Sequence, residues 1–216
     1  MTRAVLFDMD GVLTDSEPVI NAAAIAGLRE YGVEAEPEDF VPFVGMGEDR
    51  YIGGVAEKYG VAYRLEMKRR VYEIYLEMLP GRLESFPGVH ALLQRLRGRG
   101  VLLAVASSAD RIKVEANLRA IEVPLDWFEA IVVGDDVERK KPSPDIYLKA
   151  ASGVGCSPAA CCVVEDAVNG VEAAKAADMR CVAVAQRFSP AVLRAAGPDR
   201  VCETLAAVTL DDLGIA

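Results

Sequence analysis

Histidine is nearly absent from this chain of 216 residues, in which His90 is the only one. A zinc site built from several histidines is therefore excluded, and a Ser-His-Asp triad would have to use this residue. His90 follows Gly-Val and precedes Ala-Leu-Leu, a context that favours a helix start over a catalytic site. We therefore expect acid–base chemistry to depend on carboxylates.

Positive charge is also scarce, because 24 Lys and Arg face 33 Asp and Glu, giving a net charge of -9. This balance disfavours nucleic-acid partners, which need a basic surface, and argues against an anionic membrane surface. No apolar run approaches the roughly 20 residues that span a bilayer. Asp8 comes too early for a secretory signal. We expect a cytoplasmic protein, or one of the chloroplast stroma if a transit peptide was removed.

Cysteine occurs five times, an odd number, and no C-x-x-C pair is present. Several of the cysteines lie in or beside apolar runs, where a thiol behaves as a small hydrophobic group. We predict reduced, mostly buried cysteines and a reducing compartment. Hydrophobic residues make up 52% and charged residues 26% of the chain, which is an ordinary composition for a globular protein with one core and a modest insertion.

Five short runs rich in valine, alanine and isoleucine have the length of buried strands. They cover residues 4–7, 101–106, 130–133, 161–164 and 181–185. Helical patterns lie between the later runs, at residues 89–99, 112–121, 145–152 and 167–177. Strands alternating with helices predict an α/β fold with a parallel, Rossmann-like sheet and right-handed crossovers.

The gap between the first two runs is much longer than one crossover helix requires. It contains helical patterns at residues 16–31, 48–59 and 62–79. We therefore predict a helical cap at residues 16–85, inserted into a catalytic core made of residues 1–15 and 86–216. Arg64, Lys68, Arg69 and Arg70 form a basic cluster on the last of these helices, which we interpret as a solvated face.

Polar side chains follow four of the five predicted strands. Ligands of open parallel sheets bind at the carboxyl ends of the strands, so these groups are expected to converge. One polar residue there would mean little, because loops are polar, but four such ends with two acidic pairs are informative. Carboxylates, hydroxyls and an ammonium fit a divalent cation with a phosphate. The groups are Asp8 and Asp10; Ser107 and Ser108; Asp135, Asp136, Lys140 and Lys141; Glu165 and Asp166.

Four segments, in order, resemble the signature motifs of the haloacid dehalogenase-like hydrolases. They are Phe7-Asp8-Met9-Asp10-Gly11-Val12-Leu13, Val105-Ala106-Ser107-Ser108, Lys141-Pro142-Ser143-Pro144 and Val164-Glu165-Asp166. The resemblance covers essentially the whole chain. The helical insertion resembles the cap of the subgroup that contains beta-phosphoglucomutase and phosphoglycolate phosphatase.

The resemblance implies a role for each motif residue. Asp8 would attack phosphorus to give an aspartyl-phosphate, and Asp10 would serve as acid and then as base. Ser107, Ser108 and Lys141 would hold the phosphoryl group, with Lys141 preferred to Lys140 because it directly precedes Pro142. Mg²⁺ would bind the Asp8 carboxylate, the Asp10 main-chain carbonyl and Asp166, with Glu165 acting directly or through water.

Three activities remain open on the sequence. A phosphatase acting on a small phosphorylated metabolite is favoured over a phosphomutase resembling beta-phosphoglucomutase, and a catalytically silent regulatory domain is the third reading. Mutases of that type carry a histidine near position 20, where this chain has Ile20 and Asn21. They also carry a cap arginine after a glycine turn, where this chain has Glu48, with Arg50 nearby.

Two further segments, residues 39–43 and 106–114, resemble the hydrolase domain of a large chloroplast photoprotection protein of plants. The sequence does not identify the substrate. We expect residues 43–50 of the cap to contribute to its selection, and we expect a monomer or a weak homodimer.

Overall fold

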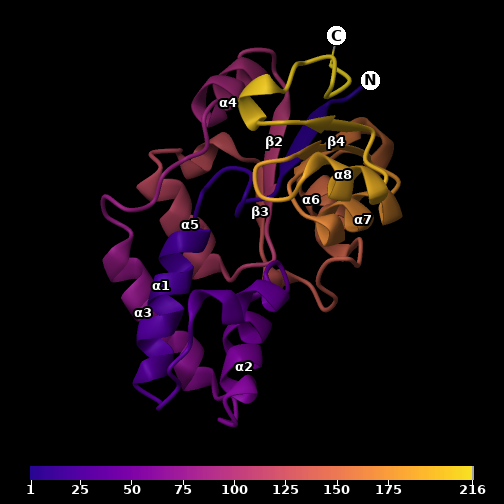
Figure 1. The fold of residues 1–216 in the computed structure, drawn as a ribbon. Coiled ribbons are helices and arrows are strands. Elements are labelled where there is room, and N and C mark those ends of the chain that lie inside the picture. The colour runs from indigo at the N-terminus through magenta and orange to yellow at the C-terminus, as the bar shows by residue number, and fades with distance from the viewer. Residues whose placement is uncertain (216) are drawn as a thin grey trace.

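The core of the protein is a six-stranded parallel sheet, in a computed structural model that describes residues 1–215 (Figure 1). The strand order is β3-β2-β1-β4-β5-β6. The strands are β1 (Ala4–Phe7), β2 (Leu102–Ala106), β3 (Ala130–Val132), β4 (Cys161–Glu165), β5 (Arg180–Val184) and β6 (Arg200–Cys202). The five predicted strands and the α/β class are confirmed. The sixth was missed because it is an edge strand of only three residues, none of them fully buried.

Strand β1 lies in the middle of the sheet, and all four of its residues are fully buried. Its side chains alternate between two hydrophobic clusters, with Val5 and Phe7 in one and Ala4 and Leu6 in the other. This alternation follows from the two-residue repeat of a strand covered on both faces.

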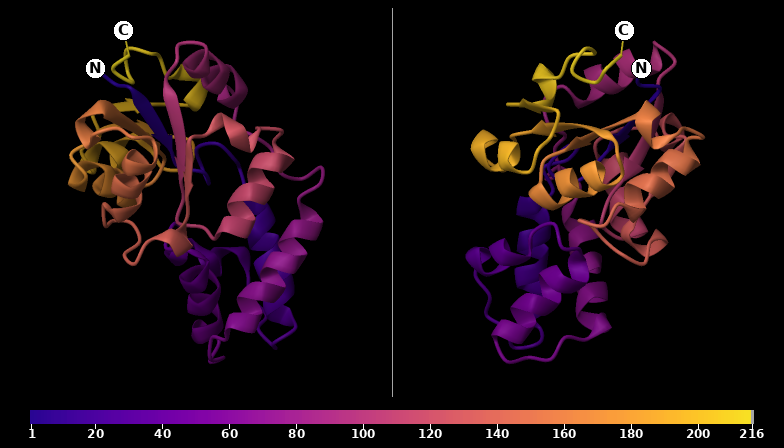
Figure 2. Two further views of the ribbon diagram at one scale, coloured as in Figure 1. Left: turned by 180° about the vertical axis from the view of Figure 1, so that it is seen from behind. Right: turned by 90° about the vertical axis from the view of Figure 1, so that its right-hand side faces the viewer.

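Helices cover both faces of the sheet (Figures 1 and 2). One cluster contains side chains of α4 (Val89–Arg97) and α5 (Arg111–Ala120). The other contains side chains of α6 (Asp145–Gly153), α7 (Val168–Ala176) and α8 (Pro190–Ala195). Short 3₁₀ turns connect these elements, at Leu125–Trp127, Gly134–Asp136, Pro158–Ala160 and Leu205–Ala207. His90 lies in the first turn of α4, as predicted.

The remaining helices form a group at one end of the molecule, below the core in Figure 1. They are α1 (Glu17–Arg29), the 3₁₀ segment η1 (Pro37–Phe43), α2 (Glu48–Lys58) and α3 (Leu65–Met78). Helices α1 and α3 pack closely, since a Cβ atom on Gly27 would lie 2.7 Å from Val71 Cγ2. The arrangement is consistent with a cap at residues 16–85, and the two boundaries stay predictions.

The chain leaves and re-enters the core along two adjacent segments. Thr14 pairs with Ser85 in an antiparallel bridge, and the Asp15 amide donates to the Glu84 carbonyl at 3.0 Å. The Phe86 amide donates to the Leu13 carbonyl at 3.2 Å. The cap is therefore joined to the core through a short double connection beside the loop that follows β1.

The interpretation of the basic cluster as a solvated face was wrong for Lys68. Its side chain is buried and forms ion pairs with Asp49 at 3.1 Å and Asp110 at 2.8 Å. Lys68 lies on the face of α3 that turns toward the start of α5, so it joins the cap to the core. Arg64 and Arg69 are exposed, and Arg70 pairs with Glu30 on the cap surface at 3.0 Å.

The cysteines are free thiols, of which four are buried and Cys202 is half-buried. Burial raises the pKa of Cys161 to about 11, which keeps this thiol protonated. Among residues 1–215, no helix has the length and apolar character that crossing a membrane requires.

Candidate active site

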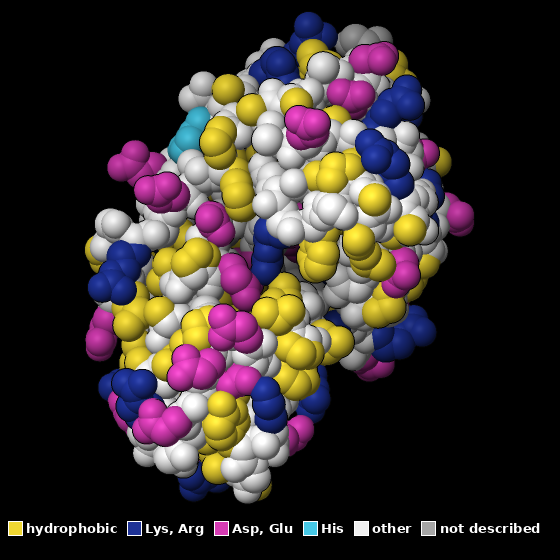
Figure 3. All heavy atoms as spheres, in the orientation of Figure 1, with side chains coloured by type: hydrophobic (Ala, Val, Ile, Leu, Met, Phe, Trp, Pro, Cys, Tyr) yellow, Lys and Arg dark blue, Asp and Glu magenta, His cyan; other side chains and the backbone are white. Residues whose placement is uncertain are grey.

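A pocket lies where the carboxyl ends of β1, β2 and β4 meet the cap. Figure 3 shows the surface hollowed between the two regions, with acidic and basic side chains at the opening. Each predicted site residue lines this pocket: Asp8, Asp10, Ser107, Ser108, Lys141, Glu165 and Asp166. Parallel topology explains the convergence, because strands that are distant in sequence end at the same edge of the sheet.

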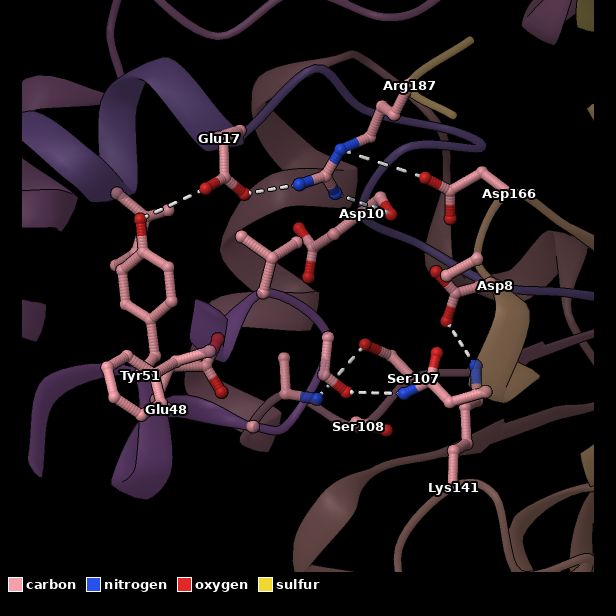
Figure 4. A pocket seen from close by; sticks show the side chains of 18 of the residues that line it. Asp8, Asp10, Glu17, Glu48, Tyr51, Ser107, Ser108, Lys141, Asp166 and Arg187 are labelled. Carbon is pink, nitrogen blue, oxygen red and sulfur yellow. Dashed lines mark hydrogen bonds and ion pairs between the residues drawn. The ribbon is translucent and has the colours of Figure 1, made fainter. Parts of the chain in front are cut away.

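Asp8 directly follows β1 and is 8% exposed. The Lys141 ammonium donates to Asp8 Oδ1 at 2.6 Å (Figure 4). It also donates to Glu165 Oε1 at 2.6 Å. Burial raises the pKa of Asp8 to about 7, although Lys141 opposes this effect. Burial by itself would lower the pKa of Lys141, but Asp8 and Glu165 hold it well above its usual value. Lys141 is therefore a fixed cation beside Asp8.

Glu165 uses both of its carboxylate oxygens inside the core. Oε1 accepts hydrogen bonds from Lys141 and from the Tyr147 hydroxyl at 2.9 Å. Oε2 accepts from the main-chain amides of Asp166 at 2.8 Å and Ala167 at 2.9 Å. A Cβ atom on Gly170 would lie 1.7 Å from Oε1, so the close packing around this carboxylate requires glycine there. This arrangement holds Lys141 in place.

Asp10 has a different environment from Asp8. Lys113 donates to its Oδ2 at 2.9 Å, and Ser16 and Asn117 donate to its Oδ1. Burial raises the pKa of Asp10, but Lys113 and the Ser16 hydrogen bond outweigh burial and bring this pKa below its usual value. Asp10 is thus surrounded by hydrogen-bond donors.

Lys113 was not predicted as a site residue. It is buried in α5, and its ammonium also contacts Glu48 Oε1 of the cap at 2.9 Å. A sequence signal existed, because Lys113 and Asn117 are four residues apart and therefore share a helix face. The same helix face carries apolar residues, so in the sequence Lys113 and Asn117 are typical of an ordinary amphipathic helix.

Asp166 is 1% exposed, and its Oδ2 accepts no hydrogen bond from the described residues. Burial, reinforced by Glu165, raises its pKa well above the usual value. One oxygen each of Asp8, Glu165 and Asp166 lie within 4.8 Å of one another. A Cβ atom on Gly11 would lie 2.0 Å from Asp166 Oδ2, so the loop after β1 approaches this carboxylate closely. Such clustered hard oxygens fit a divalent cation.

Arg187, in the loop after β5, is a second site residue that the sequence did not reveal. Its guanidinium lies 3.7 Å from Asp166 Oδ2 and 2.5 Å from Glu17 Oε2 of the cap. It also donates to the main-chain carbonyl of Asp10 at 3.4 Å. No motif surrounds Arg187 in the sequence, so only its position in the fold reveals it.

The two serines after β2 line the pocket, whereas Lys140 and the acidic pair after β3 lie outside its lining. The Ser107 hydroxyl accepts from the Ala109 amide at 3.2 Å, and the buried Ser108 hydroxyl has no partner within residues 1–215. Lys140 and Asp135 do not line the pocket. Asp136 pairs with Arg111 at 2.8 Å. These positions agree with the preference for Lys141 over Lys140.

The cap contributes a wall made largely of residues 43–48. Gly45 and Gly47 have φ values of 79° and 83°, which glycine adopts without strain and other residues rarely do. Asn169 of α7 donates to the Gly45 carbonyl at 2.9 Å, which ties this turn to the core. Arg50 turns away, pairing with Glu57 at 3.1 Å.

A model of the haloacid dehalogenase-like hydrolases matches residues 2–178. The chain is 45% identical over 214 residues to SUPPRESSOR OF QUENCHING 1, a chloroplastic protein of Arabidopsis thaliana. That match covers 97% of this chain and only 20% of the relative, so the chain spans about a fifth of that protein. The chain is 33% identical to the phosphorylated carbohydrates phosphatase of Thermotoga maritima, with 81% of each protein covered.

Among solved structures, the fold is similar to that of CbbY from Rhodobacter sphaeroides. The phosphate complex has a TM-score of 0.86 at 28% identity, and all of both chains is covered. A D10N mutant in complex with xylulose-(1,5)bisphosphate has a TM-score of 0.89 at 27% identity, with 99% of both chains covered. The family match, the relatives and the shared fold agree: this chain is an enzyme of the haloacid dehalogenase-like hydrolase family, and its relatives over most of its length include phosphatases.

Proposed function

We propose that this chain is a Mg²⁺-dependent phosphatase that hydrolyses a phosphate monoester of a small, sugar-like metabolite. The observation that carries the proposal is the pairing of Asp8 and Asp10 with two different buried lysines in one pocket. Two carboxylates in separate environments, one beside Lys141 and one beside Lys113, fit separate roles in nucleophilic and acid–base chemistry.

In the first step, an Asp8 oxygen forms a bond to phosphorus while the bond from phosphorus to the ester oxygen breaks. Asp10 enters this step in its acid form and gives its proton to that leaving oxygen. In the second step, Asp10 takes a proton from water, whose oxygen attacks phosphorus and releases Asp8 and inorganic phosphate. The proton taken from water restores the acid form of Asp10 for the next cycle.

Asp8, Asp166 and the Asp10 main-chain carbonyl would hold the metal ion. The buried Asp166 Oδ2 supports this assignment, because it accepts no hydrogen bond from the described residues and the Arg187 guanidinium reaches it only at 3.7 Å. When bound, Mg²⁺ would neutralise phosphate charge and permit the approach of Asp8. Glu165 acts indirectly in this proposal, since both of its oxygens already accept hydrogen bonds and hold Lys141.

Ser107, Ser108 and Lys141 hold the transferring phosphoryl group in this proposal. The unpartnered Ser108 hydroxyl is free to donate to a phosphate oxygen. Lys141 offsets the repulsion between the Asp8 carboxylate and the phosphate, an electrostatic contribution that matters greatly in phosphoryl transfer.

The cap supports a phosphatase rather than a mutase. Asn21 stands beside the position expected for a mutase histidine, and its amide donates to Pro37 O and Tyr51 Oη. Arg50, the nearest cap arginine, lies over the Phe43 ring and outside the pocket lining. Sugar-like substrates are supported by the relatives, since the Thermotoga maritima protein is a phosphorylated carbohydrates phosphatase and CbbY binds a sugar bisphosphate.

The test is Mg²⁺-dependent phosphate release from p-nitrophenyl phosphate and from a panel of sugar phosphates. We expect Asp8→Asn to abolish turnover, while circular dichroism and thermal unfolding stay close to wild type. Mass spectrometry should detect a phosphoryl adduct on wild-type protein quenched during turnover, and none on Asp8→Asn. Activity of Asp8→Asn above about 1% of wild type would contradict the role of Asp8 as nucleophile.

A further inference from the structure

The side chains around the pocket carry an excess of negative charge. Among the described residues that line it, three are cationic, namely Lys113, Lys141 and Arg187. Six are acidic, namely Asp8, Asp10, Glu17, Glu48, Glu165 and Asp166. A phosphorylated ligand therefore enters a site that repels it except where a cation faces it directly.

Each of these cations is already held between two carboxylates. Lys141 lies between Asp8 and Glu165, both in the core. Lys113 and Arg187 each connect one carboxylate of the core to one of the cap, through Glu48 and Glu17 respectively. Lys141, with the proposed metal ion, faces the phosphoryl group that reacts. Among the residues that line the pocket, no further cation is left for a second phosphate.

Glu48 places a buried carboxylate in the part of the pocket wall that the cap forms. It is the first residue of α2, is 6% exposed, and lines the pocket on the side away from Asp8 (Figure 4). Its Oε1 accepts from Lys113, but its buried Oε2 has no hydrogen-bond partner in residues 1–215. Leaving such an acceptor unpaired is unfavourable, so a donor from the ligand would be stabilising there. A hydroxyl can supply that donor, whereas a phosphate dianion cannot.

We infer that Glu48 determines substrate choice, an inference that rests on the proposed function. The pocket takes the ester of a single phosphate whose leaving group is a polyhydroxyl chain or ring, with a hydroxyl donating to Glu48. A second phosphate on the leaving group would meet carboxylates of the cap and be repelled. This preference contrasts with the bisphosphate that CbbY binds.

The experiment measures inhibition of p-nitrophenyl phosphate turnover by two pairs of competitors. The first pair, glucose 6-phosphate and glucose 1,6-bisphosphate, differs by one phosphate. The second pair, sorbitol 6-phosphate and hexyl phosphate, shares a six-carbon chain and differs in its hydroxyls. In wild-type protein we expect the monophosphate and the hydroxylated member to bind at least about tenfold more tightly than their counterparts.

Glu48→Gln removes the charge with little change of shape, and we expect it to reduce the preference for the monophosphate about tenfold. The ratio of the two inhibition constants is the readout, because loss of the Lys113 partner also changes turnover itself. Glu57→Gln is the matched control, since Glu57 lies on the same helix, is exposed and pairs with Arg50 outside the pocket. This control should leave both ratios unchanged.

Equal or tighter binding of the bisphosphate to wild-type protein would overturn the inference, as would an unchanged ratio in Glu48→Gln. Equal binding of hexyl phosphate and sorbitol 6-phosphate would overturn the assignment of a hydroxylated leaving group. Each of these outcomes leaves the proposed phosphatase activity standing, because p-nitrophenyl phosphate is still hydrolysed. Absence of turnover that depends on Asp8 would instead refute the proposed function, and the inference with it.

Discussion

Two buried lysines hold the two aspartates of the site, and they differ in what fixes them. Lys141 contacts Asp8 and Glu165, which both belong to the core. Lys113 contacts Asp10 of the core and Glu48 of the cap. The environment of Asp8 is therefore complete within the core, whereas that of Asp10 includes a group that the cap supplies.

Because of this difference, a movement of the cap would affect the surroundings of Asp10 and leave those of Asp8 unchanged. The proposed nucleophile and its cation would keep their contacts if the cap moved, since neither depends on a cap residue. Such a movement would separate Lys113 from Glu48 and leave its charge directed at Asp10 alone. The proposed acid–base group is thus the one whose lysine also contacts the cap, which fits the general use of closing segments to complete a site.

Replacing the lysine of the core should have the larger effect. We predict that Lys141→Met lowers kcat about 10³-fold, because Asp8 and the phosphoryl group lose their shared cation. It should also reduce the free energy of unfolding by about 3–5 kcal/mol, since two buried carboxylates are left without a partner. Phosphate-release kinetics and urea denaturation measure the two effects.

The matched control is Lys140→Met, which changes the adjacent lysine, a residue that does not line the pocket. Its kcat should stay within about twofold of wild type, because the ion pairs with Asp8 and Glu165 belong to Lys141 and are kept in this variant. Equal losses in the two variants would remove the distinction between these lysines.

Replacing the lysine shared with the cap should have an intermediate effect. We predict that Lys113→Met lowers kcat/KM about 10- to 100-fold, within the range of general acid–base contributions. Lys113 lowers the pKa of Asp10, so its removal should let that pKa rise. The limb of the pH–rate profile that reports Asp10 should therefore move to higher pH.

Lys68→Met tests whether that shift is specific. Lys68 also joins cap to core, through Asp49 and Asp110, but it does not touch Asp10. Its loss should weaken the contact of the cap with the core without moving the profile. A profile that shifts equally in both variants would mean that cap position, and not the Lys113 charge, sets the pKa of Asp10.

Removing an ion pair inside the cap should have the smallest effect on stability and should leave turnover unchanged. Asp39 of η1 accepts from Lys58 and Tyr59, and these bonds lower its pKa to about 2 from the usual 3.8. A lowered pKa in the folded state means that the stabilisation is present above pH 3.8 and is lost as the pH falls toward 2.

We therefore predict that Asp39→Asn lowers Tm at neutral pH by about a few degrees. The difference from wild type should shrink as the pH is lowered below 4, and kcat/KM at pH 7 should not change. Thermal scans of both proteins from pH 7 to pH 3 provide the measurement. A Tm difference that grows as the pH falls would contradict the predicted loss of the Asp39 stabilisation at low pH.

The sequence predicted most of the sheet because its strands are short apolar runs buried on both faces. It missed β6 and α8, which are brief and lie at the edge, where fewer apolar residues are needed. It also missed the 3₁₀ segment η1, whose sequence has no helical repeat. The helices that were predicted have ends that differ from the prediction by a few residues at most, since caps and fraying decide the terminal turn.

The local sequence encodes the set of polar groups at the strand ends. Asp8, Ser107, Lys141 and Asp166 follow apolar strands in the chain, and parallel topology alone brings such ends together. The tertiary structure decided which partners complete them. Lys113 meets Asp10 and Glu48 across 103 and 65 residues of sequence, and Arg187 meets Glu17 across 170. No local pattern encodes contacts of that range, because they depend on where the cap is placed against the core.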